Sequence, residues 1–142
     1  MSAGRAASSH PSPEAIVAVV EDDAAARRAL TRMLRSHGLR VASFSTAEEL
    51  LHAFEATSPS CLVIDLVLPG MSGADLVEAL RAERRATPVV FVTGRIDAAQ
   101  ALKQRGLGSI PCLQKPFEPA LLVHAVAHAL EGAVPAKAKE RS

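Results

Sequence analysis

Cys61-Leu62-Val63-Ile64-Asp65 is a run of four apolar residues that ends in a carboxylate, and it is the most informative stretch of the chain. A short, continuous apolar run bounded by polar residues is typical of a strand buried on both faces of a parallel sheet. Three further runs have the same layout, Ile16–Val20, Val89–Val92 and Ile110–Leu113. Amphipathic segments of helix length separate the runs, so the sequence predicts an α/β fold.

Each of the four apolar runs is followed by polar side chains. In chain order these are Glu21, Asp22, Asp23, Asp65, Thr93 and Lys115. Ligands of open parallel sheets bind outside the carboxyl ends of the strands, so these side chains are expected to converge on one crevice. Several carboxylates, a hydroxyl and an ammonium together suit a phosphoryl group that is bound with a divalent metal.

The remaining elements complete a doubly wound sheet. A short strand is predicted at Leu39–Ser43. Helices are predicted from Asp23 to Gly38, after Ser45, and over Ala74–Arg84, Asp97–Arg105 and Glu118–Leu130. Five strands that alternate with five helices predict a flavodoxin-like parallel sheet with the strand order 2-1-3-4-5. Pro111 has no N–H for a sheet ladder, so the fifth strand is expected at an edge.

Length and composition restrict the classes of function. The 142 residues fit one domain, and the formal charge of +1 with 3% aromatic residues offers no basic or stacking surface for DNA. No stretch approaches the roughly 20 apolar residues that span a bilayer, so a cytoplasmic protein is expected. Cys61 and Cys112 lack metal-ligand spacing and are predicted to be reduced thiols.

Both ends of the chain differ in composition from its centre. Residues 1–14 are rich in Ser, Pro and Ala and have no apolar core of a signal peptide, so they are predicted to be disordered. Residues 132–142 contain Pro135 and a charged run without helical apolar spacing, and are predicted to be a disordered tail. The folded domain is therefore expected over residues 15–131.

Four motifs resemble the receiver domains of bacterial two-component response regulators. They are Val-Val-Glu-Asp-Asp at 19–23, Val-Ile-Asp-Leu-Val-Leu-Pro-Gly-Met-Ser-Gly at 63–73, Phe-Val-Thr-Gly at 91–94 and Lys-Pro-Phe at 115–117. The gaps also match, with 43 residues from Asp22 to Asp65, 28 from there to Thr93 and 22 more to Lys115. The resemblance extends from residue 16 to residue 130.

The resemblance implies that Asp65 accepts a phosphoryl group from a phosphohistidine on a sensor histidine kinase or phosphotransfer protein. Thr93 and Lys115 would bind phosphoryl oxygens, and the bond between Lys115 and Pro116 would be cis. The chain would then not be a conventional enzyme, because it would catalyse only its own phosphorylation and dephosphorylation.

The resemblance also implies a Mg²⁺ site made by Glu21, Asp22, Asp65 and the backbone carbonyl of Val67. Each polar residue taken alone also fits an ordinary role, such as a helix cap for Asp23, a solvated acid or a surface lysine. The joint spacing favours the site. His124 and His128 stand one helical turn apart, away from the apolar stripe, and are expected on a solvated face.

Cys112 departs from the family pattern, because members commonly carry Tyr or Phe there, and Gln104–Pro111 is irregular. No output domain is expected after Leu130, so the first hypothesis is a stand-alone receiver that signals by phosphorylation-dependent protein binding or phosphorelay. The alternative is a degenerate receiver that binds partners regardless of phosphorylation. A phosphatase of the haloacid-dehalogenase type is a third possibility, but it would carry a second Asp where this chain has Val67.

Overall fold

The computed structural model describes the backbone of residues 14–141 and the side chains of residues 14–132. The predicted disordered segment, residues 1–14, lies outside the described residues except for Glu14. The described chain contains one parallel sheet with the order β2-β1-β3-β4-β5. Its strands are β1 (Ile16–Val20), β2 (Arg40–Phe44), β3 (Cys61–Asp65), β4 (Val89–Thr93) and β5 (Cys112–Gln114). The predicted fold class and strand order are confirmed.

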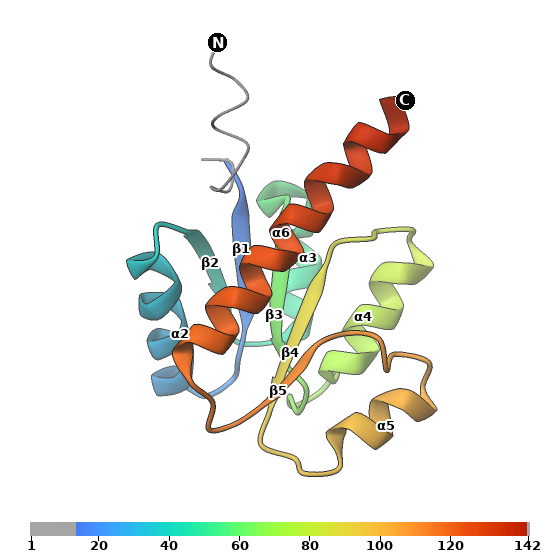
Figure 1. Ribbon diagram of the computed structural model, residues 1–142. Coiled ribbons are helices and arrows are strands. Elements are labelled where there is room, and N and C mark those ends of the chain that lie inside the picture. Colours follow the sequence, from blue (N-terminus) through green and yellow to red (C-terminus); the bar gives the residue numbers. More distant parts are fainter. Residues whose placement is uncertain (1–13, 142) are drawn as a thin grey trace.

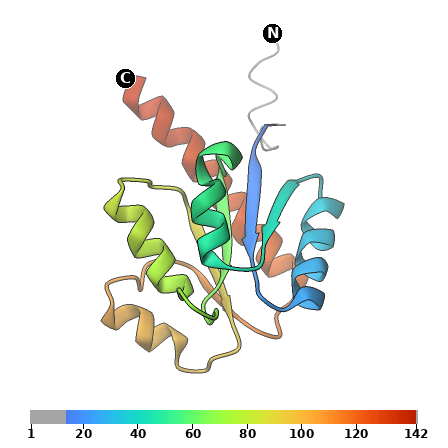
Figure 2. The same ribbon diagram turned by 180° about the vertical axis from the view of Figure 1, so that it is seen from behind.

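Within residues 14–141, five helices cover the two faces of this sheet (Figures 1 and 2). They are α2 (Ala24–Ser36), α3 (Ala47–Thr57), α4 (Gly73–Ala82), α5 (Ala98–Gln104) and α6 (Pro119–Arg141). Figure 1 shows α6 crossing the near face of the sheet, and Figure 2 shows α3 and α4 in front on the opposite face. The molecule therefore has three layers, as alternation of strands and helices in a parallel sheet requires.

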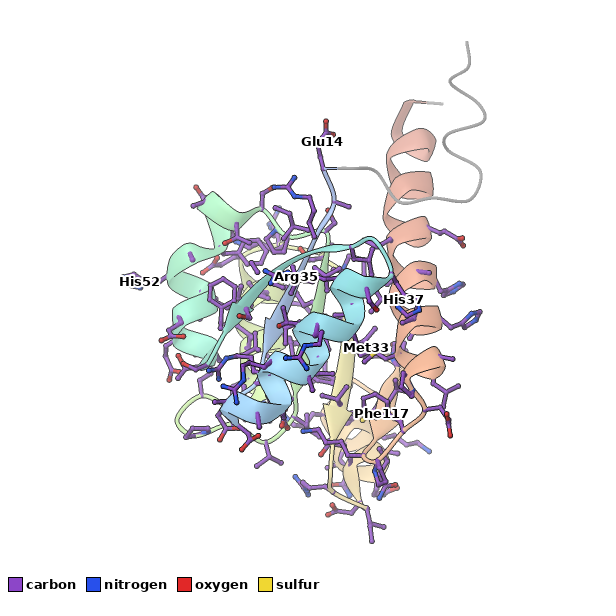
Figure 3. The ribbon with its side chains drawn as sticks, turned by 90° about the vertical axis from the view of Figure 1, so that its left-hand side faces the viewer. Glu14, Met33, Arg35, His37, His52 and Phe117 are labelled. Atoms are coloured by element: carbon purple, nitrogen blue, oxygen red, sulfur yellow. The ribbon has the colours of Figure 1, made fainter. Side chains whose placement is uncertain are left out.

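Alternate side chains of each strand enter two separate cores. Val17 and Val19 of β1 pack with Leu34 of α2 and Leu122 of α6, whereas Val20 packs on the side of α3 and α4. Met33 and Phe117 are packed against the first of these cores and are labelled in Figure 3, which views the molecule from the side of α2 and α3. The central strands are apolar throughout because both of their faces are buried.

The edge strand β5 begins later than its sequence predicted. The apolar run Ile110–Leu113 predicts a strand from residue 110, but β5 pairs with β4 only from Cys112, which lies opposite Phe91. Pro111 explains the difference, since it cannot donate a hydrogen bond to the neighbouring strand. Its carbonyl still accepts a hydrogen bond from the N–H of Phe91, at 2.9 Å.

The helix caps agree with the sequence in part. The Asp23 carboxylate accepts the N–H of Ala26 at 2.7 Å and caps α2, as predicted. The cap of α3 is displaced by one residue from the predicted Ser45, because Thr46 accepts the N–H of Glu49. Ser45 instead donates its N–H and its hydroxyl to the Glu49 carboxylate. Two neighbouring hydroxyl residues satisfy the same capping pattern, so sequence alone did not resolve them.

Helix α6 extends beyond its predicted end at Leu130. Its backbone is helical to Arg141. The side chains after Gly132 lie outside the described residues, and the disorder expected for residues 132–142 stays a prediction. Among the residues that the structure describes, no helix combines the length and the apolar character that crossing a bilayer requires.

Candidate functional site

Asp65 is the last residue of β3, the central strand, and only 7% of its surface is exposed. Both carboxylate oxygens have partners: Oδ1 accepts the backbone N–H of Val67 at 2.9 Å, and Oδ2 accepts Nζ of Lys115 at 3.0 Å. Val67, the predicted carbonyl ligand, lies in the loop directly after the strand with 52% of its surface exposed. The carboxylate is therefore fixed in orientation at the carboxyl end of the sheet.

Lys115 brings the edge strand to the centre of this site. Its backbone N–H donates to the carbonyl of Thr93 at 2.7 Å, and its ammonium donates to Oε1 of Glu21 at 2.8 Å as well as to Asp65. Burial lowers the pKa of the ammonium, but the hydrogen bonds to Glu21 and Asp65 raise it, and the net direction is upward. The ammonium therefore stays charged beside the two carboxylates. The peptide bond between Lys115 and Pro116 is cis, as the family resemblance implied.

Glu21, Asp22 and Asp65 form an acidic cluster, as the sequence predicted. Each offers a carboxylate oxygen, and these oxygens lie within 4.8 Å of one another. Glu21 is 1% exposed, whereas Asp22 is open to solvent. Buried and exposed carboxylates in one cluster fit Mg²⁺, because this cation prefers oxygen ligands and keeps several of its water molecules.

Thr93 ends β4 next to Asp65 and is 1% exposed. Its Oγ1 accepts the backbone N–H of Arg95 at 3.0 Å, which ties the threonine to the loop that follows. In that loop Arg95 forms an ion pair with Asp97 at 2.8 Å, and Ile96 is 87% exposed. The threonine hydroxyl is thus bonded to a surface loop, at the strand end that lies beside Asp65.

Two supporting residues escaped the sequence reasoning. Arg27 of α2 donates from Nη1 to the backbone carbonyl of Glu21 at 2.8 Å and so holds the first acidic segment in place. Glu48 of α3 accepts the N–H of Met71 at 3.0 Å and braces the loop after Asp65. Both contacts join side chain to backbone, and no pattern of residue types in the sequence predicts such pairs.

Gly73 lets α4 begin directly against the strand that carries Asp65. A Cβ atom at this position would lie 2.6 Å from the carbonyl oxygen of Asp65 and 3.0 Å from Cα of Leu66. Both of these atoms belong to the backbone, so they could not move aside as a flexible side chain would. The close approach of this backbone therefore explains why position 73 of the motif is a glycine.

The thiols and the helix histidines lie apart from the acidic cluster. Cys61 is fully buried in β3, where burial raises the pKa of its thiol to about 12. Cys112 is half-buried, and burial raises the pKa of its thiol as well. The two cysteines are free thiols. His124 and His128 are exposed on α6, in agreement with the prediction of a solvated face.

This chain is similar to known proteins in sequence and in structure. The family model for the response regulator receiver domain matches residues 17–127. Nodulation protein W of Bradyrhizobium diazoefficiens is 39% identical over 128 residues, which cover 90% of this chain and 56% of that protein. The chain thus spans little more than half of this relative.

Solved structures are also similar. The response regulator StyR has 34% identity and a TM-score of 0.79, with 89% of this chain and 64% of that chain covered. The BeF3-activated receiver domain of DrrB has 31% identity and a TM-score of 0.70, with 82% of this chain and 97% of that chain covered.

Proposed function

The chain belongs to the response regulator receiver family, and on this basis we propose that Asp65 accepts a phosphoryl group from a sensor histidine kinase or a phosphotransfer protein. The phosphorylated protein then signals by binding another protein or by passing the phosphoryl group on. One observation carries the proposal: a single ammonium, that of Lys115, bridges the carboxylates of Asp65 and Glu21 at the carboxyl end of the sheet. We assign the receiver unit to residues 15–131.

The proposed transfer is a displacement at phosphorus. A carboxylate oxygen of Asp65 attacks the phosphorus of a phosphohistidine, the P–N bond breaks, and the imidazole nitrogen keeps the electron pair. The product is an acyl phosphate on Asp65. Lys115 pairs with one phosphoryl oxygen as a point charge, and the hydroxyl of Thr93 donates to another. Aspartate is a modest nucleophile, so positioning and neutralisation of charge supply most of the acceleration.

The proposed cofactor is Mg²⁺, held by the carboxylates of Glu21, Asp22 and Asp65 and by the carbonyl of Val67. When bound, it neutralises negative charge on the phosphoryl group and the acids. The oxygen-only donor set and the solvent-exposed Asp22 support this choice of cation. We expect the protein in the cytoplasm, and we expect proteins rather than DNA as its partners because the formal charge is only +1.

The direct test is phosphorylation in vitro. The purified chain is incubated with Mg²⁺ and acetyl phosphate, and the intact mass is measured. We expect one phosphoryl group on the protein and none on Asp65→Asn. Asp23→Asn is the matched control, because asparagine also caps helices and this variant should still be labelled. Labelling that persists in Asp65→Asn, at Asp22 or Asp23, would show that the phosphoacceptor is assigned wrongly.

Cys112 favours a second candidate, a degenerate receiver whose binding to partners is independent of phosphorylation. A half-buried thiol stands where related domains commonly carry an aromatic ring, and it packs against the core on the side of α3 and α4. The same experiment separates the candidates. A degenerate receiver would remain unlabelled with acetyl phosphate and Mg²⁺, or would be labelled without any change in structure.

A further inference from the structure

Arg27 of α2 directs its guanidinium to the backbone rather than to a carboxylate. Its Nη1 donates to the carbonyl of Glu21 at 2.8 Å and lies 3.5 Å from the carbonyl of Asp22. Both carbonyls belong to the short segment between β1 and α2, which carries two of the three acids of the acidic cluster. Among the residues whose side chains the structure describes, none forms an ion pair with Arg27. Arg27 therefore acts on this segment through its backbone.

Asp22 is the acid of the cluster that depends most on this backbone. The carboxylate of Glu21 has two partners, Nζ of Lys115 at 2.8 Å and the N–H of Asp23 at 3.1 Å. The carboxylate of Asp65 is also held by Lys115. The carboxylate of Asp22 is exposed, and within residues 14–132 it has no hydrogen-bond partner. Its position beside the other two acids is therefore set by the course of the main chain.

Arg27 controls that course through one peptide plane. The carbonyl of Glu21 and the N–H of Asp22 belong to the same planar peptide unit. The other side of Glu21 is already fixed, because its N–H donates to the carbonyl of Phe44 at 3.0 Å. The hydrogen bond from Arg27 fixes the rotation of the plane that follows. It thereby sets the direction in which the side chain of Asp22 leaves the chain.

The positive charge of Arg27 and its hydrogen bond have opposite effects on a cation at the cluster. A fixed positive charge repels a second cation, so charge alone would lower the affinity for Mg²⁺. Water and salt screen this repulsion, because Asp22 is open to solvent. Ordering a ligand in advance raises the affinity, since less freedom is lost on binding. Groups that orient metal ligands commonly change metal affinity by about 10–100-fold, so the ordering effect is expected to prevail.

We propose that Arg27 is a positioning residue of the Mg²⁺ site, and that it raises the affinity of the site by holding the carboxylate of Asp22 beside Asp65. The proposal rests on the proposed function, since it takes the acidic cluster as the Mg²⁺ site. Arg27 touches neither the cation nor the phosphoryl group. It acts through the peptide plane between Glu21 and Asp22, and it orders one ligand before the cation arrives.

The test measures the Mg²⁺ affinity of the full chain by ¹H–¹⁵N NMR titration, without a phosphoryl donor. In Arg27→Met the dissociation constant should rise about tenfold. Arg27→Lys keeps the charge and a donor, so it should recover most of the affinity. The matched control is Arg28→Met, which removes the same charge from an exposed neighbour on α2 and should bind Mg²⁺ at least as tightly as the unmodified chain. Methionine favours helices about as well as arginine, so neither replacement weakens α2 as a helix.

The sign of the change in affinity distinguishes ordering from charge. Mg²⁺ binding by Arg27→Met that is as tight as binding by Arg28→Met would show that charge governs, and would overturn the proposal. Amide exchange in Mg²⁺-free buffer is the second measurement. Exchange of the amides of Asp22 and Asp23 should be faster in Arg27→Met, while exchange in β3 should stay unchanged. Equally faster exchange throughout β3 would indicate general destabilisation and would refute a positioning role.

The outcome is independent of phosphorylation, because Mg²⁺ binding is measured without a phosphoryl donor. Absence of a Mg²⁺ response in the unmodified chain would refute the metal site, and with it the role of Arg27. Loss of affinity in Arg27→Met, in a chain that acetyl phosphate fails to label, would support the role of Arg27 and contradict the proposed phosphorylation of Asp65.

Discussion

Nζ of Lys115 lies 3.0 Å from Oδ2 of Asp65, although 50 residues separate them in the chain. The aspartate side chain is 10% exposed and that of the lysine 32%. The same ammonium contacts Glu21, whose side chain is 2% exposed. Two nearly buried carboxylates therefore share one ammonium. Its positive charge bears on both the stability and the chemistry of the site.

Lys115→Ala removes that cation and leaves two carboxylates unneutralised. We expect the free energy of unfolding in Mg²⁺-free buffer to fall by about 1–3 kcal/mol, a range reduced for the partial exposure of the lysine. Urea denaturation measures the change, and Mg²⁺ should restore more stability to this variant than to the unmodified protein. Lys103→Ala, at an exposed site on α5, is the control. Equal stability of the two variants would contradict a neutralising role for Lys115.

Mg²⁺ should raise the midpoint of thermal unfolding, since it relieves repulsion within the acidic cluster and binds only the folded state. At a hundred times its dissociation constant, the stabilisation is about 2.7 kcal/mol. Asp22→Ala should remove both this response and phosphorylation, and Glu21→Ala should weaken both. Glu118→Ala, at an exposed site, serves as the control. An unchanged Mg²⁺ response in Asp22→Ala would show that the acids are merely solvated.

Gly73→Ala should destabilise the protein and displace the phosphoacceptor. The added methyl group meets the backbone of Asp65 at 2.6 Å, and overpacking of this kind costs about 1–3 kcal/mol. Calorimetry gives the loss of stability, and the rate of labelling by acetyl phosphate gives the effect on the site. Gly94→Ala is the matched control, because a Cβ atom there has nothing within 4 Å. Similar stability of both variants would be inconsistent with the close approach at Gly73.

Phosphorylation should change the loop Gly94–Ala98 more than β5. The Thr93 hydroxyl turns towards the phosphoryl group. Because this hydroxyl accepts a hydrogen bond from the backbone N–H of Arg95 at 3.0 Å, the backbone of Arg95 must move with it. Cys112 is small and transmits little change in volume to the edge strand. An ion pair with Asp75 at 2.8 Å holds Arg105 at the end of α5, so the amide exchange of residues 102–107 should change little. Amide exchange with and without a BeF3 phosphoryl mimic measures this, and changes centred on Cys112 and α6 would reverse the prediction.

Stability should fall in alkaline solution because of the buried thiol of Cys61. Its pKa is raised to about 12 in the folded state, while an unfolded cysteine ionises near pH 8.5. The unfolded state therefore loses its proton first as the pH rises. The favourable contribution of the protonated Cys61 thiol to the free energy of unfolding is complete below about pH 8.5. It declines by about 1.4 kcal/mol per pH unit above that pH. Urea denaturation between pH 8 and 11 should show a shallower decline for Cys61→Ala, and equal slopes would argue against ionisation of Cys61.

The fold was predictable because burial on both faces leaves a clear mark on a parallel strand. Cys61–Ile64 and Val89–Val92 are apolar throughout, and both form central strands. The convergence of Glu21, Asp65 and Lys115 followed from the same reasoning, since parallel strands end at one edge. These inferences rest on residue type and order alone.

Other features depend on contacts between segments and were missed or misplaced. Arg27 and Glu48 act through backbone groups of distant residues, and no periodicity marks them. The choice of Thr46 over Ser45 as a cap depends on backbone angles. The late start of β5 follows from Pro111, whose presence predicted an edge strand but not how many residues would pair.

The strands β2, β1 and β3 are neighbours in the sheet and all precede residue 66 in the chain. A ribosome therefore completes Glu21, Asp22 and Asp65 before it adds Thr93 and Lys115. A domain generally folds as a unit, however, so the acidic cluster and the ammonium that neutralises it come together in the same folding event.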